Sequence, residues 1–133
     1  MQQRLGEGAD IEQESDKRTP LSGAARGGHL VVVEALLQHG AKADGKSGGA
    51  AVRLASLGGH PEVLRLLAGR GAPLELTNDS GDTALSYAAR DGHVEVVRAL
   101  LELGAKTDGK SGKRARREAK GKGNDAIMQL LSR

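Results

Sequence analysis

The chain of 133 residues contains no cysteine, no phenylalanine and no tryptophan, and it has a single tyrosine. The missing cysteines exclude a disulfide framework and a thiolate zinc site. The missing aromatic residues exclude a core built on large rings, so alanine, leucine and valine must form it. The opening residues MQQRLGEGAD lack the apolar stretch of a secretion signal, and no apolar run approaches membrane-spanning length. We therefore expect an intracellular protein, cytoplasmic or nuclear, without a membrane partner.

The two ends of the chain differ in charge. The net charge is +3, but residues 1–16 contain five acids and one base, whereas residues 106–133 contain nine bases and three acids. Residues 17–105 are almost balanced, with ten bases and nine acids. The basic character of the protein therefore belongs to its C-terminal end.

One segment of the sequence recurs three times, as GGHLVVVEALLQHGA (27–41), GGHPEVLRLLAGRGA (58–72) and DGHVEVVRALLELGA (91–105). A degraded fourth copy is KGNDAIMQLLSR (122–133), and the pair Gly8 and Ala9 near the start matches the Gly-Ala pair that ends each copy. Self-similarity at a period of thirty-odd residues predicts a repeat solenoid, in which each unit buries its apolar face against its neighbours.

Each good copy predicts two short helices. In TPLSGAARGGH, Thr19 is a favourable N-cap, Pro20 suits the first helical position, and Gly27 with Gly28 ends the helix. A second helix follows, in which Val32, Val33, Leu36 and Leu37 form one apolar stripe. Neither helix can bury its apolar face alone.

The segments TPLSGAARGGHLVVVEALLQHGA and DTALSYAARDGHVEVVRALLELGA resemble the ankyrin repeat. This resemblance implies an all-α solenoid of antiparallel helix pairs joined by short hairpin-like loops, with about three full repeats plus partial terminal repeats. We expect one domain over 1–133, divided into a partial N-terminal repeat (1–15), three repeats (16–44, 45–76 and 77–108) and a basic C-terminal capping repeat (109–133).

The copies depart from the ankyrin pattern in three ways. The usual histidine after Thr-Pro-Leu is replaced by Ser22, Arg53, Ser86 and Arg117. The loop before the second and fourth copies is nine residues long, against eleven before the third. Arg116 stands where a core leucine is expected, which suits a terminal repeat facing solvent. Since the chain opens inside a second helix, we also expect an uncovered N-terminal face that could self-associate.

Two segments match the phosphate-loop string, GAKADGKS (40–47) and GAKTDGKS (104–111). A phosphate loop needs a buried strand before it and a helix that opens at the Lys-Ser pair. Here a helix is expected before each match, and Gly48 with Gly49, or Gly112, follows it. We therefore predict no nucleotide or other cofactor.

Histidines 29, 60 and 93 occupy the same place in successive copies. Stacked helix pairs would hold them roughly 10 Å apart, too far to share one metal ion. We interpret them as imidazoles bonded to backbone at the turn between helices. No catalytic set of side chains emerges, so we predict neither a metal site nor an enzyme.

A cluster of cations follows the last good copy, comprising Lys110, Lys113, Arg114, Arg116, Arg117, Lys120 and Lys122. Three interpretations stay open for this cluster. It could form a solvated capping helix, it could bind an acidic partner or act as a nuclear import signal at 113–117, or it could contact nucleic acid. The absence of aromatic residues in the cluster argues against readout of single-stranded bases.

The resemblance places partner binding at the loop tips and the exposed positions of the first helices. Carried over to this sequence, these positions are Lys17, Arg18, Ser22, Arg26, Arg53, Leu57, Asp79, Ser80, Asp82, Tyr87, Arg90 and Asp91. Their mixed charge favours a protein partner. We therefore predict a non-enzymatic protein-interaction scaffold, with a module that binds nucleic acid or another polyanion through 106–122 as the alternative.

Overall fold

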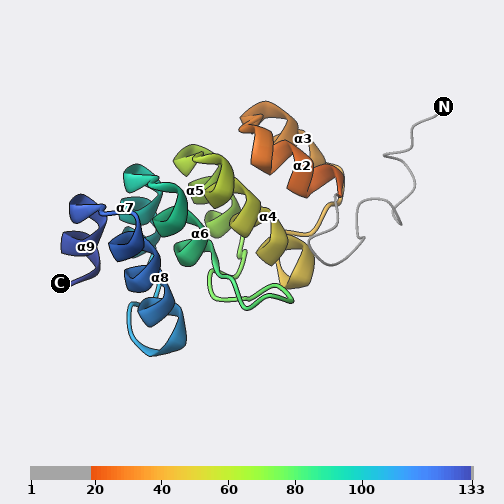
Figure 1. The fold of residues 1–133 in the computed structure, drawn as a ribbon. Coiled ribbons are helices and arrows are strands. Elements are labelled where there is room, and N and C mark those ends of the chain that lie inside the picture. Colours follow the sequence, from red (N-terminus) through yellow and green to blue (C-terminus); the bar gives the residue numbers. More distant parts are fainter. Residues whose placement is uncertain (1–18, 133) are drawn as a thin grey trace.

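The computed structural model describes residues 19–132, which contain eight helices and no strand (Figure 1). In chain order they are α2 (Pro20–Gly27), α3 (Leu30–Gln38), α4 (Gly45–Gly58), α5 (Pro61–Gly69), α6 (Ala84–Asp91), α7 (Val94–Glu102), α8 (Gly109–Gly121) and α9 (Asp125–Leu131). The expected partial repeat 1–15, together with Lys17 and Arg18, lies outside the described residues. None of the described helices combines the length and apolar character that crossing a membrane requires.

The helices form two parallel rows. The first helices α2, α4, α6 and α8 pack on one another in order, and so do the second helices α3, α5, α7 and α9 (Figure 1). Each first helix also packs on the second helix that follows it. The expected all-α solenoid of stacked helix pairs is therefore confirmed.

Alanine, leucine and valine form the core, as the composition requires. Leu21, Val52 and Leu85 take the same position on successive first helices, and each is at most 2% exposed. On the second helices the equivalent residues Val63 and Val96 are 1% exposed. Small side chains along the first helices, such as Ala55 and Ala88, are completely buried and let neighbouring helices lie close together.

The short first helices α2 and α6 begin with matching capping boxes. The hydroxyl of Thr19 accepts from the Ser22 amide, and the Ser22 hydroxyl accepts from the Thr19 amide, at 3.0 and 2.9 Å. Thr83 and Ser86 repeat the arrangement at the start of α6. Gly28 then ends α2 in the left-handed conformation, which glycine adopts without strain. The cap and the end of this helix are confirmed.

The long first helices α4 and α8 begin differently. They contain 14 and 13 residues, against eight in α2 and α6, because the residues expected in a hairpin-like loop form an additional N-terminal turn. The expectation of such a loop before every repeat is therefore wrong for these two. A loop shortened by two residues leaves too little chain for a separate turn.

The outward face of α3 is apolar and exposed. Val32 is 48% exposed, whereas Val63, Val96 and Ile127 at the same place in later repeats are at most 1% exposed. Val31 is 76% exposed and stands where α5 and α7 carry Glu62 and Glu95. Within the described part of the chain, this face lacks the covering that later repeats receive from their predecessors.

Candidate protein-interaction surface

The loop between α5 and α6 is folded around the side chain of Asn78. Its amide oxygen accepts from the backbone N–H of Ser80 at 2.9 Å and of Asp82 at 3.0 Å. The backbone N–H of Asn78 also donates to the Asp82 carbonyl, which closes the turn. Asparagine commonly organises turns in this way, because its short side chain reaches backbone groups a few residues on.

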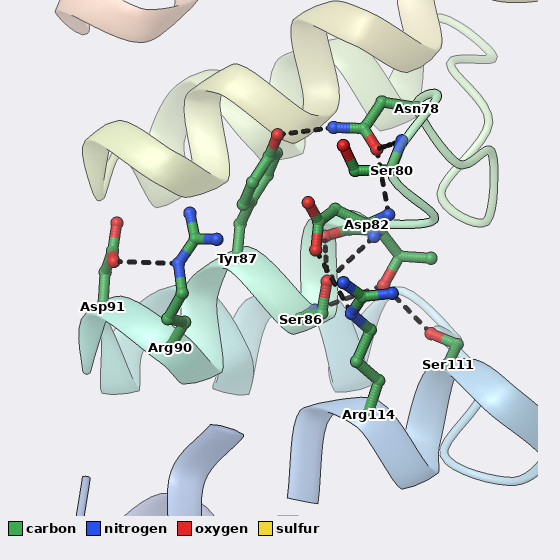
Figure 2. Close-up of polar contacts among 10 residues, drawn as sticks. Asn78, Ser80, Asp82, Ser86, Tyr87, Arg90, Asp91, Ser111 and Arg114 are labelled. Carbon is green, nitrogen blue, oxygen red and sulfur yellow. Dashed lines mark hydrogen bonds and ion pairs between the residues drawn. The ribbon is translucent and has the colours of Figure 1, made fainter. Parts of the chain in front are cut away.

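Tyr87 on α6 connects this loop to the helix. The side-chain N–H of Asn78 donates to the Tyr87 hydroxyl at 2.6 Å, and the two side chains point toward each other in Figure 2. The Arg90 guanidinium lies 4.9 Å from the centre of the Tyr87 ring and forms an ion pair with Asp91 at 3.5 Å. Loop, ring and cation therefore make one continuous surface, which we call the loop–α6 surface: Asp79, Ser80, Tyr87, Arg90 and Asp91.

The base of the same loop is connected to the following repeat. The guanidinium of Arg114 on α8 forms an ion pair with Asp82 at 3.3 Å, and the hydroxyls of Thr83 and Ser111 lie 3.0 Å apart (Figure 2). Because Asp82 is also fixed by Asn78, the loop is held from two sides. The backbone of the loop is therefore held in one conformation without a bound partner.

The structure divides the predicted binding residues into two groups. Arg26, Asp79, Ser80 and Asp91 are exposed, and Leu57, Tyr87 and Arg90 are half-buried. Ser22, Arg53 and Asp82 are buried, so the expectation that they offer surface for a partner is wrong.

The three buried residues have structural partners. The Ser22 hydroxyl is engaged in the capping box of α2. The Arg53 guanidinium donates to the Leu76 carbonyl at 2.9 Å, which ties α4 to the loop that follows α5. Asp82 pairs with Arg114. Each polar group is therefore engaged inside the fold, and only Asp82 joins two repeats.

Comparison with protein families matches "Ankyrin repeats (3 copies)" to residues 1–78 and 52–133, which together span the chain. The chain belongs to the ankyrin-repeat family. Ankyrin repeats form a non-enzymatic fold that generally mediates protein–protein interaction. The division of this chain into individual repeats stays a prediction. Comparison with curated proteins finds no match.

The histidines of the ankyrin repeats take different environments along the array. His93 lies with Nε2 2.9 Å from the Leu57 carbonyl near the C-terminal end of α4, so the expected bond to backbone is confirmed there. His60 is half-buried beside Gly28, and His29 is exposed. In the last repeat Asn124 replaces the histidine, and its side chain accepts from the Ile127 amide as an N-cap. Among residues 19–132, no three histidine or acidic side chains gather closely enough to hold a metal ion.

The two Gly-Lys-Ser segments open helices, since α4 begins at Gly45 and α8 at Gly109. Gly48 with Gly49, and Gly112, follow these segments and are themselves helical. The expectation that these glycines argue against a helix at the Lys-Ser pair is therefore wrong. Gly48 and Gly112 are instead required, because a side chain there would collide with the carbonyl oxygen of Ala43 or Thr107. The strand of a phosphate loop is missing in the described range: α3 and α7 precede the two segments.

The predicted cationic cluster separates into bonded and exposed residues. Arg114 pairs with Asp82, and the Arg116 guanidinium donates to the Thr107 carbonyl at 2.7 Å. Lys122 is exposed and lies just beyond the C-terminal end of α8, where its backbone N–H forms the C-cap. Four exposed residues remain along the helix and share one side of it, namely Lys110, Lys113, Arg117 and Lys120. We call these four the basic face of α8.

Two features of the surface were not predicted from the sequence. The role of Asn78 could have been predicted from the string Asn-Asp-Ser-Gly, which is typical of a turn. The bond from Arg53 to the Leu76 carbonyl has no local signal, because it joins residues 23 positions apart.

Proposed function

We propose that this ankyrin-repeat protein is a non-enzymatic interaction module that binds a partner protein through its loop–α6 surface. The observation that carries the proposal is the bracing of the α5–α6 loop by Asn78, Tyr87 and Arg114. A loop held in one conformation loses little entropy on binding, so more of the contact energy remains as affinity.

The chemistry of the surface favours a polar partner of mixed charge. Asp79 and Asp91 present carboxylates, whereas Arg90 presents a guanidinium stacked on Tyr87. Tyrosine and arginine are the side chains that most often dominate the energy of protein interfaces. Exposed ion pairs add specificity rather than much affinity.

Site-specific photo-crosslinking tests the proposal. A photoreactive amino acid replaces Ser80 or Asp91 on the proposed surface, and Gln38 or Arg70 serves as the control at the ends of the second helices. We expect one protein to crosslink several-fold more strongly at Ser80 and Asp91 than at the two control positions. Equal crosslinking at all four positions would contradict the proposal.

The crosslinked partner then allows a quantitative measurement. We expect Asp79→Ala together with Arg90→Ala to weaken its binding by about tenfold or more, which corresponds to about 1.4 kcal/mol. Arg65→Ala with Arg70→Ala removes two exposed side chains of α5 and its C-cap and should leave the affinity unchanged. Both double variants must keep the helical circular dichroism of the parent protein.

Polyanion binding is the second candidate function, and the basic face of α8 is the observation that favours it. The face carries no aromatic ring, so charge alone would hold a nucleic acid there. Affinity for a DNA duplex would then fall steeply as salt rises, whereas binding at the loop–α6 surface should change little. The nuclear import signal at 113–117 and an intracellular location also stay predictions.

A further inference from the structure

The cations of the basic face lie on one side of α8, opposite the side that packs into the array. Gly112, Ala115 and Ala119 are buried on the side that packs into the array, whereas Lys110, Lys113, Arg117 and Lys120 are exposed. The four cations follow a spacing of three or four residues, so each is a neighbour of the next along the helix. Over ten residues this row is about 15 Å long.

These cations have no compensating partner in the part of the fold that the structure describes. Within residues 19–132, none of the four side chains forms an ion pair or a hydrogen bond. Like charges three or four residues apart destabilise a helix by a few tenths of a kcal/mol per pair, and Lys110 and Lys113 also lie at the positive end of the helix dipole. An acidic ligand would relieve both effects.

The chain itself contains a segment of matching chemistry. Residues 7–16, EGADIEQESD, hold five acids and no base. Several acids elsewhere are already engaged, including Asp82 with Arg114 and Glu102 with Arg65. We propose that the basic face of α8 binds the acidic segment 7–16 of a second copy of this chain, so that copies associate head to tail.

The length of the chain favours a second copy over the same copy. Three steps between packed first helices separate α2 from α8, which is roughly 25–30 Å at the usual packing distance. Asp16 is three residues from Thr19 and Glu12 is seven, so even a fully extended chain carries them only about 10 and 25 Å. Glu7, Asp10 and Glu12 have enough chain to reach α8 of their own copy, whereas Glu14 and Asp16 do not. The α8 of another copy is not subject to this limit on reach.

Head-to-tail contact uses two different surfaces of each molecule, so both remain available at the ends of any assembly. Such a heterologous interface produces rings or growing chains rather than a closed symmetric dimer. Because the contact is made of exposed charges, it should be strong at low salt and lost at high salt.

Sedimentation of the full chain at hundreds of micromolar protein tests the proposal. In about 20 mM salt we expect the weight-average mass to reach at least double that of the monomer, and in about 1 M salt to return to the monomer. The basic-face variant K110Q/K113Q/R117Q/K120Q and the acidic-segment variant E7Q/D10N/E12Q/E14Q/D16N should each stay monomeric in low salt.

An equimolar mixture of the two variants gives the sharpest result. One supplies an intact acidic segment and the other an intact basic face, so the mixture should form a dimer that grows no further. The matched control R26Q/R70Q/R98Q/K106Q removes four exposed cations from other elements and should still associate. Circular dichroism confirms that every variant is folded.

Three results would overturn the proposal. The wild-type chain could remain monomeric in low salt, the acidic-segment variant could associate as wild type does, or the mixture could fail to form dimers. Titration with a DNA duplex distinguishes a nucleic-acid ligand from the acidic segment. Duplex binding that requires the basic face, in a chain that does not self-associate, would assign this face to nucleic acid instead.

Discussion

The first helices of this ankyrin array are of two kinds that alternate along the chain. The short helices α2 and α6 begin at a threonine whose side chain caps the helix. A loop braced by Asn78 precedes α6, where the spacing from the Gly-Ala pair to the capping threonine is eleven residues. The long helices α4 and α8 begin at Asp44 and Asp108, neither of which makes a side-chain cap bond. In their repeats the spacing from the Gly-Ala pair to the expected cap position is nine residues, and part of that stretch is helical.

The difference shows that the first helix of a repeat can begin in two different ways within one array. In the short repeats, side-chain caps define the start of the helix. In the long repeats, close contact between the preceding loop and a glycine in the helix defines it, at Gly48 and Gly112. A short, capped first helix leaves a projecting loop for a partner, whereas in a long first helix the equivalent residues are part of the helix.

Removing the last long repeat is the most severe test of this comparison. A chain that ends at Ala105 loses α8 and α9 and exposes the faces of α6 and α7 that pack on them. We expect a loss of more than about 5 kcal/mol, comparable with the whole stability of a small domain, with aggregation on concentration. A soluble truncation that unfolds cooperatively in urea would show that the short repeat needs no cover. The basic-face variant is the control, because it keeps Ala115 and Ala119 in place.

The glycine of the long helices is the next test. Gly48→Ala puts a methyl group against the Ala43 carbonyl oxygen, and we expect a loss of about 3 kcal/mol in the free energy of unfolding. Gly69→Ala in α5 meets no atom within 4 Å and should stabilise the protein by about 0.5 kcal/mol. Urea denaturation measures both, and equal effects would show that the close approach at Gly48 is unimportant.

The caps give a smaller contrast between the two kinds of helix. Thr83→Ala removes the capping bond of α6 and the contact with Ser111, so we expect a loss of about 1.5 kcal/mol. Asp108→Ala removes no side-chain cap bond, and only its favourable charge near the helix dipole is lost, about 0.3 kcal/mol. Thermal unfolding of both variants compares them directly. If Asp108→Ala cost as much as Thr83→Ala, the two kinds of start would be equivalent.

Ser56 in α4 provides the smallest and opposite effect. Its hydroxyl is buried and has no hydrogen-bond partner among the described residues, whereas Ala25 and Ala89 stand at the same place in the short helices. We expect Ser56→Ala to stabilise the protein by about 1 kcal/mol, because a buried hydroxyl without a partner loses its bonds to water. Destabilisation on urea denaturation would mean that the hydroxyl is bonded in solution.

Most of the fold could be predicted, but less of the surface. The repeated His and Gly-Ala positions predicted the helix pairs and their order, because the copies carry similar glycine turns and apolar stripes. The additional turns of α4 and α8 were missed, since glycine-rich strings such as Gly45–Gly49 favour loops on local propensity. The burial of Arg53 was missed because its partner, the Leu76 carbonyl, lies 23 positions further along the chain.

The sequence by itself determined that this chain is an array of short helix pairs with an acidic beginning and a basic end. Local caps, helical spacing and a repeated period are properties of neighbouring residues, so they can be recognised without a structure. Only the tertiary structure decided which polar side chains are buried between repeats and which cations gather on the basic face of α8. Those outcomes depend on contacts between residues far apart in the chain, where packing overrides local preference.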